Sequence, residues 1–158
     1  EEAISLGALA FGYTVYIGSE HEAKMIAEFA KIEEEAEKYN LPLIGWMYPR
    51  GKAVEGKEYS KEILSYGARI ALEVGAEMIK IPYSGDLESF RWVVSSAGKV
   101  KVVVMGGKKQ TEESFFKMAE DVLSAGAIGL AVGRNVWQTE NPLAVSKKLA
   151  EIIFGENV

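Results

Sequence analysis

The sequence predicts an α/β fold built on a parallel sheet, and three observations support that prediction. Apolar, β-rich runs alternate five times with segments whose apolar residues recur at helical spacing. The strand–helix units repeat regularly, roughly every 30 residues or a little less, as βαβ units do. Each expected strand runs into a turn rich in Gly, Pro, Arg, Lys or Ser. Alternation of this kind is typical of parallel strands covered by helices.

The first third of the chain is expected to form two strands around one helix. Residues 8–17 are apolar and β-rich and end at a Gly-Ser pair, which predicts a strand and a loop. A helix is expected over 21–40, because its apolar residues recur at helical spacing and Asn40 stops it. Residues 41–51 read as the second strand, ended by Pro49 and Gly51.

The middle of the chain repeats this pattern. A helix is expected over 60–74, where the apolar residues again share one side and Gly75 follows. The run EMIKIPYSGD, residues 77–86, predicts the third strand. Residues 87–98 then read as a helix that ends at a glycine.

The last third predicts two further units. VKVVVMGGKK, residues 100–109, is the fourth expected strand and runs into a glycine pair. A capping pattern that begins at Thr111 opens the helix expected over 111–126. Residues 127–135 predict the fifth strand, and residues 142–155 the last helix.

Composition narrows the class of protein. The chain has 158 residues, 48% of them hydrophobic and 26% charged, which fits one globular domain over 1–158. The formal net charge of −5 argues against a nucleic-acid partner. With no cysteine and one histidine, disulfides, thiolate sites and histidine-rich metal sites are excluded, and we expect neither a metal nor a cofactor. No apolar run approaches a membrane span, so we expect a cytoplasmic protein with no membrane partner.

The start of the chain bears on the choice of fold. It opens EEAISLGALAFGYTVYIGS, without Met and within a helical pattern that breaks at Gly7, so we expect a piece of a longer protein. Five units suit either part of a (β/α)₈ TIM barrel or an open five-stranded parallel sheet, including a doubly wound one. Length favours the open sheet, whereas the abrupt start favours the partial barrel with its amino-terminal strands missing.

Lys80 is the first candidate for chemistry, because it lies within an apolar strand. Desolvation favours the neutral form of an amine, and a neutral amine attacks a carbonyl to form a Schiff base. We expect Tyr48 to lie at the same level of the second strand and to move protons. The alternative is that Lys80 extends its ammonium to the rim of the sheet and Tyr48 belongs to the core.

Two glycine turns in the last third are candidates for binding a phosphate. One follows the fourth strand at Gly106 and Gly107, and the other follows the fifth at Gly133 and Arg134. Glycine lets backbone N–H groups approach an anion, and a guanidinium adds a forked donor. The alternative is that these glycines only allow the turns to form and bind no ligand.

Three other prominent residues are expected to take no part in the chemistry. Trp92 and Trp137 lie beside apolar neighbours and are expected to pack in the interior. His21 is expected on the surface.

Several segments together resemble the archaeal-type class I fructose-1,6-bisphosphate aldolases, the DhnA family. They are GYTVYIGS, GWMYPRGK, ARIALEVGAEMIKIPYSGD, the Gly-Gly turn and AGAIGLAVGRNVWQ, and the resemblance covers essentially the whole chain. It implies a (β/α)₈ barrel, of which this chain looks like strands four to eight. It also implies metal-independent, reversible cleavage of fructose 1,6-bisphosphate to dihydroxyacetone phosphate and glyceraldehyde 3-phosphate, in glycolysis and gluconeogenesis.

The resemblance also assigns roles to residues. It matches Lys80 to the Schiff-base lysine and Tyr48 to a proton-transfer tyrosine. The residues alone leave open whether Arg50 binds substrate or closes a loop ion pair, and the resemblance matches it to a substrate-contacting arginine. The phosphate-holding segments of the family match this set: Met105, Gly106, Gly107, Gly133 and Arg134.

This chain departs from the family beside the Gly-Gly pair. Met105 and Lys108 stand where the family usually has a small polar residue and a proline. A hydroxyl contact to phosphate is therefore expected to be lost, while the backbone donors remain.

Other functions and partners follow from the same resemblance. A 2-amino-3,7-dideoxy-D-threo-hept-6-ulosonate synthase of the same family is one alternative, and an inactive fragment that binds a phosphorylated ligand is another. We expect a phosphorylated sugar as substrate. Either a homo-oligomer or a complementing amino-terminal barrel segment is expected as partner, since the outer strands would otherwise be open edges.

Overall fold

The sheet has five strands, all parallel, in a computed structural model that describes residues 2–155. The strands lie side by side in the order in which they occur in the sequence. They are β1 (Phe11–Ile17), β2 (Leu43–Pro49), β3 (Met78–Ile81), β4 (Lys101–Met105) and β5 (Gly129–Ala131).

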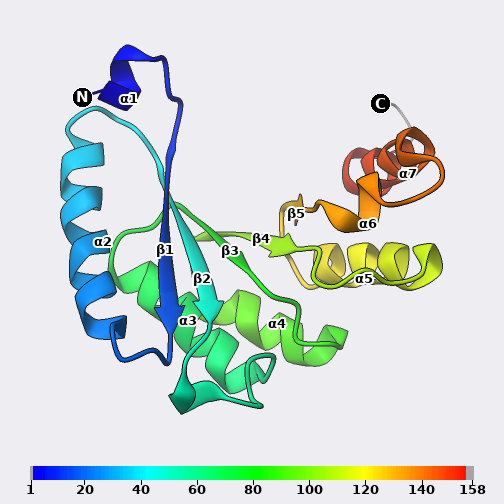
Figure 1. The fold of residues 1–158 in the computed structure, drawn as a ribbon, viewed down its shortest axis with the longest axis horizontal. Helices are drawn as coiled ribbons and strands as arrows, with labels where there is room; N and C mark the ends of the chain where they lie inside the picture. Colours follow the sequence, from blue (N-terminus) through cyan, green and yellow to red (C-terminus); the bar gives the residue numbers. More distant parts are fainter. Residues whose placement is uncertain (1, 156–158) are drawn as a thin grey trace.

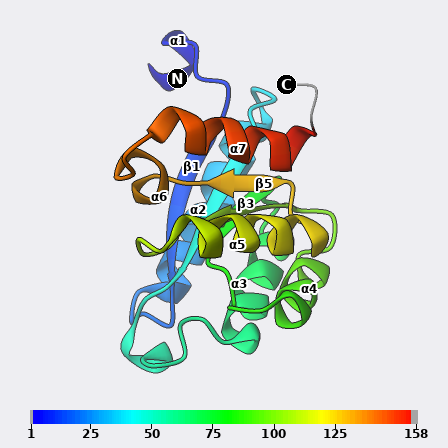
Figure 2. The same ribbon diagram turned by 90° about the vertical axis from the view of Figure 1, so that its right-hand side faces the viewer.

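Helices follow the strands around the outside of the curved sheet. Figure 1 shows them from α2 beside β1, through α3 and α4, to α5 and α7 at the opposite end. Figure 2 shows α5, β5 and α7 stacked at that end. The helices are α1 (Glu2–Ser5), α2 (Glu22–Glu37), α3 (Lys61–Glu73), α4 (Leu87–Ser96), α5 (Glu112–Ser124), α6 (Arg134–Trp137) and α7 (Pro142–Phe154), with a 3₁₀-helix at Lys52–Val54.

Side-chain caps begin four of the helices. Ser60, Asp86, Thr111 and Asn141 each accept a hydrogen bond from a backbone N–H of the first turn. The Thr111 hydroxyl accepts from the backbone N–H of Ser114 at 3.3 Å, which confirms the predicted start of α5. The glycines expected after α3, α4 and α5 all have positive φ angles, the conformation in which many helices end.

The strand order separates two versions of an open sheet. A doubly wound sheet reverses its order at a switch point, and this sheet does not. A right-handed crossover after every strand in such an order puts the helices on one face. The described chain is therefore an open, sequentially ordered parallel sheet with one helix-covered face.

Alternation along the strands confirms that the two faces differ. Val15, Met47, Ile79 and Val104 are fully buried on the face that the helices cover. The helices contribute large side chains to the same core, and Phe29, Phe90 and Phe115 are fully buried. On the opposite face the residues of β2 and β3 are half-buried or exposed. This second face is available to a ligand or to further polypeptide.

The structure corrects parts of the sequence-based description. The strands are shorter than expected, and the short helix α6 was not predicted. Trp92 and Trp137 are exposed by 63% and 66%, so the prediction that they pack in the interior was wrong. Apolar neighbours in sequence do not reveal on which side of a helix a residue lies. His21 is exposed, as predicted.

Membrane-spanning helices and clustered metal ligands are both absent from the described part of the chain. None of the helices within residues 2–155 has the length and apolar run that crossing a lipid bilayer needs. Over the same residues, no three His, Asp or Glu side chains gather as potential metal ligands.

Candidate active site

Lys80 lies in β3 on the face of the sheet that the helices leave uncovered. Strand pairing places it beside Trp46 of β2 and Val103 of β4. Its neighbour Ile79 points to the opposite face and is fully buried. Lys80 itself is half-buried, so its side chain lies over the apolar strands without being enclosed by them.

Tyr48 shares this face with Lys80, as predicted, because Trp46 and Tyr48 are two residues apart in β2. The expected level was wrong, however. The register pairs Lys80 with Trp46, so Tyr48 lies two residues nearer the carboxyl end of the sheet. The phenol therefore projects from the rim beyond the lysine.

Arg50 leaves β2 immediately after Tyr48 and remains close to it. The guanidinium carbon lies 5.8 Å from the centroid of the Tyr48 ring, within range of a cation–π interaction. The backbone N–H of Arg50 donates to the carbonyl oxygen of Ile17 at 2.9 Å, which ties this loop to the end of β1. Arg50 is exposed and so can reach an anionic ligand.

A cavity of about 370 Å³ brings three candidate residues together at the carboxyl ends of the strands. Tyr48, Arg50 and Met105 all line it, and Lys80 does not. Its other walls come from Pro49, Glu58, Tyr59, Pro82 and Lys108. The side chains that line the cavity thus include two cationic groups, Arg50 and Lys108, and one carboxylate, Glu58.

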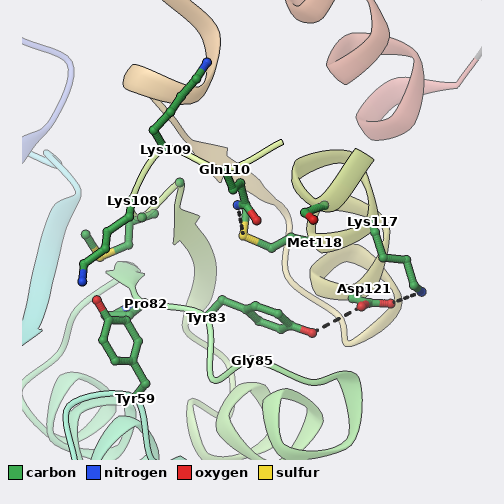
Figure 3. Close-up of a pocket in the computed structure, with 14 residues that line it drawn as sticks. Tyr59, Pro82, Tyr83, Gly85, Lys108, Lys109, Gln110, Lys117, Met118 and Asp121 are labelled. Carbon is green, nitrogen blue, oxygen red and sulfur yellow. Dashed lines mark hydrogen bonds and ion pairs between the residues drawn. The ribbon is translucent and has the colours of Figure 1, made fainter. Parts of the chain in front are cut away.

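A second cavity, of about 520 Å³, adjoins the first and is shown in Figure 3. Met105, Gly106, Gly107 and Lys108 line it together with residues of α5. Because both cavities share Met105 and Lys108, the start of this loop lies between them.

Tyr83 forms part of the wall of this second cavity. Its hydroxyl donates to a carboxylate oxygen of Asp121 at 3.3 Å, and Lys117 pairs with the same carboxylate at 2.6 Å (Figure 3). Burial and the negative charge of Asp121 raise the pKa of Tyr83 to about 12. Tyr83 is therefore neutral near pH 7 and serves as a hydrogen-bond donor in the wall.

The two glycine turns lie against each other. A guanidinium nitrogen of Arg134 donates to the carbonyl oxygen of Gly107 at 3.2 Å. The backbone N–H of Gly106 donates to Ala131 at 3.4 Å, continuing the pairing of β4 and β5. Gly107 has a φ angle of 66°, which disfavours a residue with a Cβ atom. The two turns predicted from the sequence thus contact each other directly.

Asn135 is a residue of this region that was not singled out from the sequence. It is only 2% exposed, and its side-chain amide bonds to three backbone groups of the loop after β4. Asparagine is common on surfaces and in turns, and only burial gives its amide this role. The one feature of the sequence that could have pointed to a role for Asn135 in the site is its position directly after the Gly-Arg pair.

Comparison with known proteins identifies a family. The model of the DeoC/LacD family aldolases matches residues 1–139. A class 1 fructose-bisphosphate aldolase of Thermoproteus tenax is 54% identical over 156 residues, which are 98% of this chain and 59% of that protein. A 2-amino-3,7-dideoxy-D-threo-hept-6-ulosonate synthase of Archaeoglobus fulgidus is 40% identical over 155 residues, covering 98% of this chain and 56% of that protein.

Solved structures agree with this result. An archaeal fructose 1,6-bisphosphate aldolase superposes with a TM-score of 0.93 at 54% identity, covering 98% of this chain and 61% of that one. The structure of an archaeal aldolase whose catalytic lysine is covalently bound to a carbinolamine intermediate also superposes with a TM-score of 0.93. It is 52% identical, and the match covers 98% of this chain and 61% of that one. The chain thus spans about three fifths of the length of these relatives. On the family match and these identities, the chain belongs to the DeoC/LacD family of aldolases.

Proposed function

We propose that this chain carries the Schiff-base half of a class I aldolase that cleaves fructose 1,6-bisphosphate reversibly to dihydroxyacetone phosphate and glyceraldehyde 3-phosphate. The observation that carries the proposal is a half-buried lysine, Lys80, on the helix-free face of a parallel sheet. A tyrosine and an arginine follow on the neighbouring strand, at the rim where ligands of such sheets bind.

The whole domain is proposed to be a (β/α)₈ barrel, to which residues 1–158 contribute strands four to eight. The sequential strand order and the single helix-covered face support this, because a barrel is a sheet of that kind closed on itself. The outer strands β1 and β5 each have an unpaired edge among the described residues. We propose that an amino-terminal barrel segment completes the sheet, and that the protein forms a homo-oligomer.

Lys80 is proposed as the nucleophile. Its neutral amine adds to the ketone carbon of the substrate, water leaves, and a protonated imine forms. This imine withdraws the electrons of the carbon–carbon bond that breaks, a base takes the proton of the adjacent hydroxyl group, and that carbon leaves as the aldehyde. The enamine that remains on Lys80 takes up a proton, and water hydrolyses the resulting imine to release dihydroxyacetone phosphate and the free amine. We assign proton transfer to Tyr48, whose phenol lies at the rim beyond Lys80.

Arg50 and the two glycine turns are proposed to hold the phosphates of the sugar. Arg50 reaches the smaller cavity, and Met105, Gly106 and Gly107 line the larger one. Arg134 contacts Gly107 from the turn that begins at Gly133. Backbone N–H groups and guanidinium groups are the donors that phosphates accept best.

The 54% identity to an aldolase, against 40% to the heptulosonate synthase, supports fructose 1,6-bisphosphate as the substrate. Met105 has no hydroxyl to offer a phosphate. Lys108 lines both cavities and supplies an ammonium group nearby.

Borohydride trapping tests this proposal. The chain is incubated with dihydroxyacetone phosphate and reduced, and any mass adduct is located by peptide mapping. We expect an adduct on Lys80 and none in Lys80→Ala. Lys101→Ala is the matched control, because Lys101 pairs with Met78 on the same face of the sheet and lies two residues toward its amino end. A folded chain that gives no adduct, or an adduct on Lys101, would refute the assignment.

A further inference from the structure

The loop that follows β4 is attached to α6 by side-chain hydrogen bonds. The amide nitrogen of Asn135 donates to the carbonyl oxygen of Gly106 at 2.6 Å and to that of Lys108 at 3.0 Å. Its amide oxygen accepts from the backbone N–H of Gln110 at 2.9 Å. Both polar atoms of the buried Asn135 side chain therefore have hydrogen-bond partners, as buried polar groups generally do.

Arg134 completes this attachment. Its guanidinium donates to the carbonyl oxygen of Gly107, which lies between the two carbonyl groups that Asn135 holds. Three consecutive carbonyl oxygens, those of residues 106, 107 and 108, therefore point toward α6.

The planar trans peptide bond gives this arrangement a consequence. In each peptide unit the N–H points opposite to the C=O. The N–H groups of Gly107, Lys108 and Lys109 must therefore point away from α6. Among residues 2–155, none of these three N–H groups has a hydrogen-bond acceptor. Successive unpaired N–H groups around a residue with positive φ form a concave site for an anion.

We infer that Asn135 is a positioning residue for phosphate: it holds the carbonyl groups of this loop toward α6 and so presents the N–H groups of Gly107, Lys108 and Lys109 to a phosphate. The inference rests on the proposed function, because it names the residue that shapes the phosphate site of that reaction. Asn135 itself is buried and touches no substrate.

The unaltered chain provides the first test. Inorganic phosphate is titrated into labelled protein, and the backbone amide signals of the loop are followed by NMR. We expect the amide protons of Gly107, Lys108 and Lys109 to shift strongly. Gln110, whose N–H is already bound by Asn135, should shift little. If the three amides do not respond, or if Gln110 responds equally, the inference is wrong.

Two variants provide the second test. Asn135→Asp keeps the size of the side chain and its acceptor for Gln110, but loses the donor to the two carbonyl oxygens. Asn135→Ala loses all three bonds. The control is Asn141→Ala, which removes an asparagine that also bonds to backbone, at the start of α7 and away from the loop. Trapping on Lys80 is measured with dihydroxyacetone phosphate and with unphosphorylated dihydroxyacetone.

The ratio of trapping with the phosphorylated ketone to trapping with the unphosphorylated one distinguishes a positioning role of Asn135 from a general loss of structure. In both Asn135 variants we expect the preference for the phosphorylated ketone to fall about tenfold or more. The loop no longer holds its N–H groups toward the phosphate, and hydrogen bonds from these N–H groups to a charged group are lost. Trapping of dihydroxyacetone should remain unchanged. Equal loss with both ketones, or an unchanged ratio, would overturn the inference.

The inference and the proposed function can fail separately. Absence of any adduct in the unaltered chain would refute the aldolase proposal, while the phosphate titration would still decide whether the amides of Gly107, Lys108 and Lys109 bind phosphate. If neither variant folds, Asn135 is needed to hold this loop in the folded chain, and amides that do not respond to phosphate in the unaltered chain would still overturn the inference.

Discussion

Gly51 provides a quantitative test of how the site is held together. It has an extended backbone, with φ of 177°, so any residue could adopt its conformation. A Cβ atom at this position would nevertheless collide with the backbone of Gly18 and Ser19 in the loop after β1. On both sides of Gly51, hydrogen bonds join the same loops: Arg50 N–H to Ile17 at 2.9 Å and Ala53 N–H to Gly18 at 3.3 Å.

The expected cost of Gly51→Ala follows from these contacts. Overpacking against backbone, which cannot rotate away as a side chain can, costs about 1–3 kcal/mol. Weakening both loop hydrogen bonds adds about 1 kcal/mol each. We therefore expect the free energy of unfolding to fall by about 3 kcal/mol or more, measured by urea denaturation followed by circular dichroism.

Gly56→Ala is the matched control for this change. Gly56 has a φ of 75°, and a Cβ atom added there would meet no heavy atom within 4 Å, so its cost is conformational only, about 1 kcal/mol. If Gly51→Ala is no more destabilising than Gly56→Ala, the loops after β1 and β2 can move apart at little cost in free energy. The contact between these two loops would then not be what positions Arg50.

Two further predictions concern stability. The hydrogen bond to Glu28 raises the pKa of Tyr13 to about 12, and burial raises that of Tyr83 to about 12, from an ordinary 10.0. The folded state therefore holds more protons than the unfolded state between these values, so the stability from both tyrosines is present below pH 10 and lost as the pH rises toward 12. Tyr13→Phe and Tyr83→Phe should each flatten the decline of stability in that window, and an unchanged slope would contradict the assignment. Phe90→Ala should cost about 3–5 kcal/mol in chemical denaturation, because Phe90 is fully buried and packs edge-on to Tyr83 at 5.3 Å between ring centroids. Phe154→Ala, at a position 71% exposed, should cost within about 0.5 kcal/mol, and similar costs for the two would argue against this core.

Much of the fold follows from local patterns. Apolar, β-rich runs predicted five strands, and apolar residues at helical spacing predicted the helices that follow them; the structure contains all of these elements. Thr111 and the glycine after α3 were predicted as helix boundaries and occupy those positions. These features depend on residues a few positions apart, because helix spacing, caps and turn conformations are short-range.

The arrangement of the candidate site was harder to predict from the sequence. The face shared by Lys80 and Tyr48 followed from two-residue alternation, but their relative level depends on strand register. Register is set by the packing of whole strands and turns, which no local pattern reports. The exposure of Trp92 was missed for a related reason, since it depends on which side of α4 faces the sheet.

The sequence by itself determined the type and order of the elements and the chemical groups at the ends of the strands, because both are encoded by neighbouring residues. Only the tertiary structure decided which of these groups meet. Asn135 shows the difference: it is separated from Gly106 by a helix and a strand, and packing of the two turns places its amide against that carbonyl group. A buried amide bonds to whatever backbone the fold brings to it, so its role exists only in three dimensions.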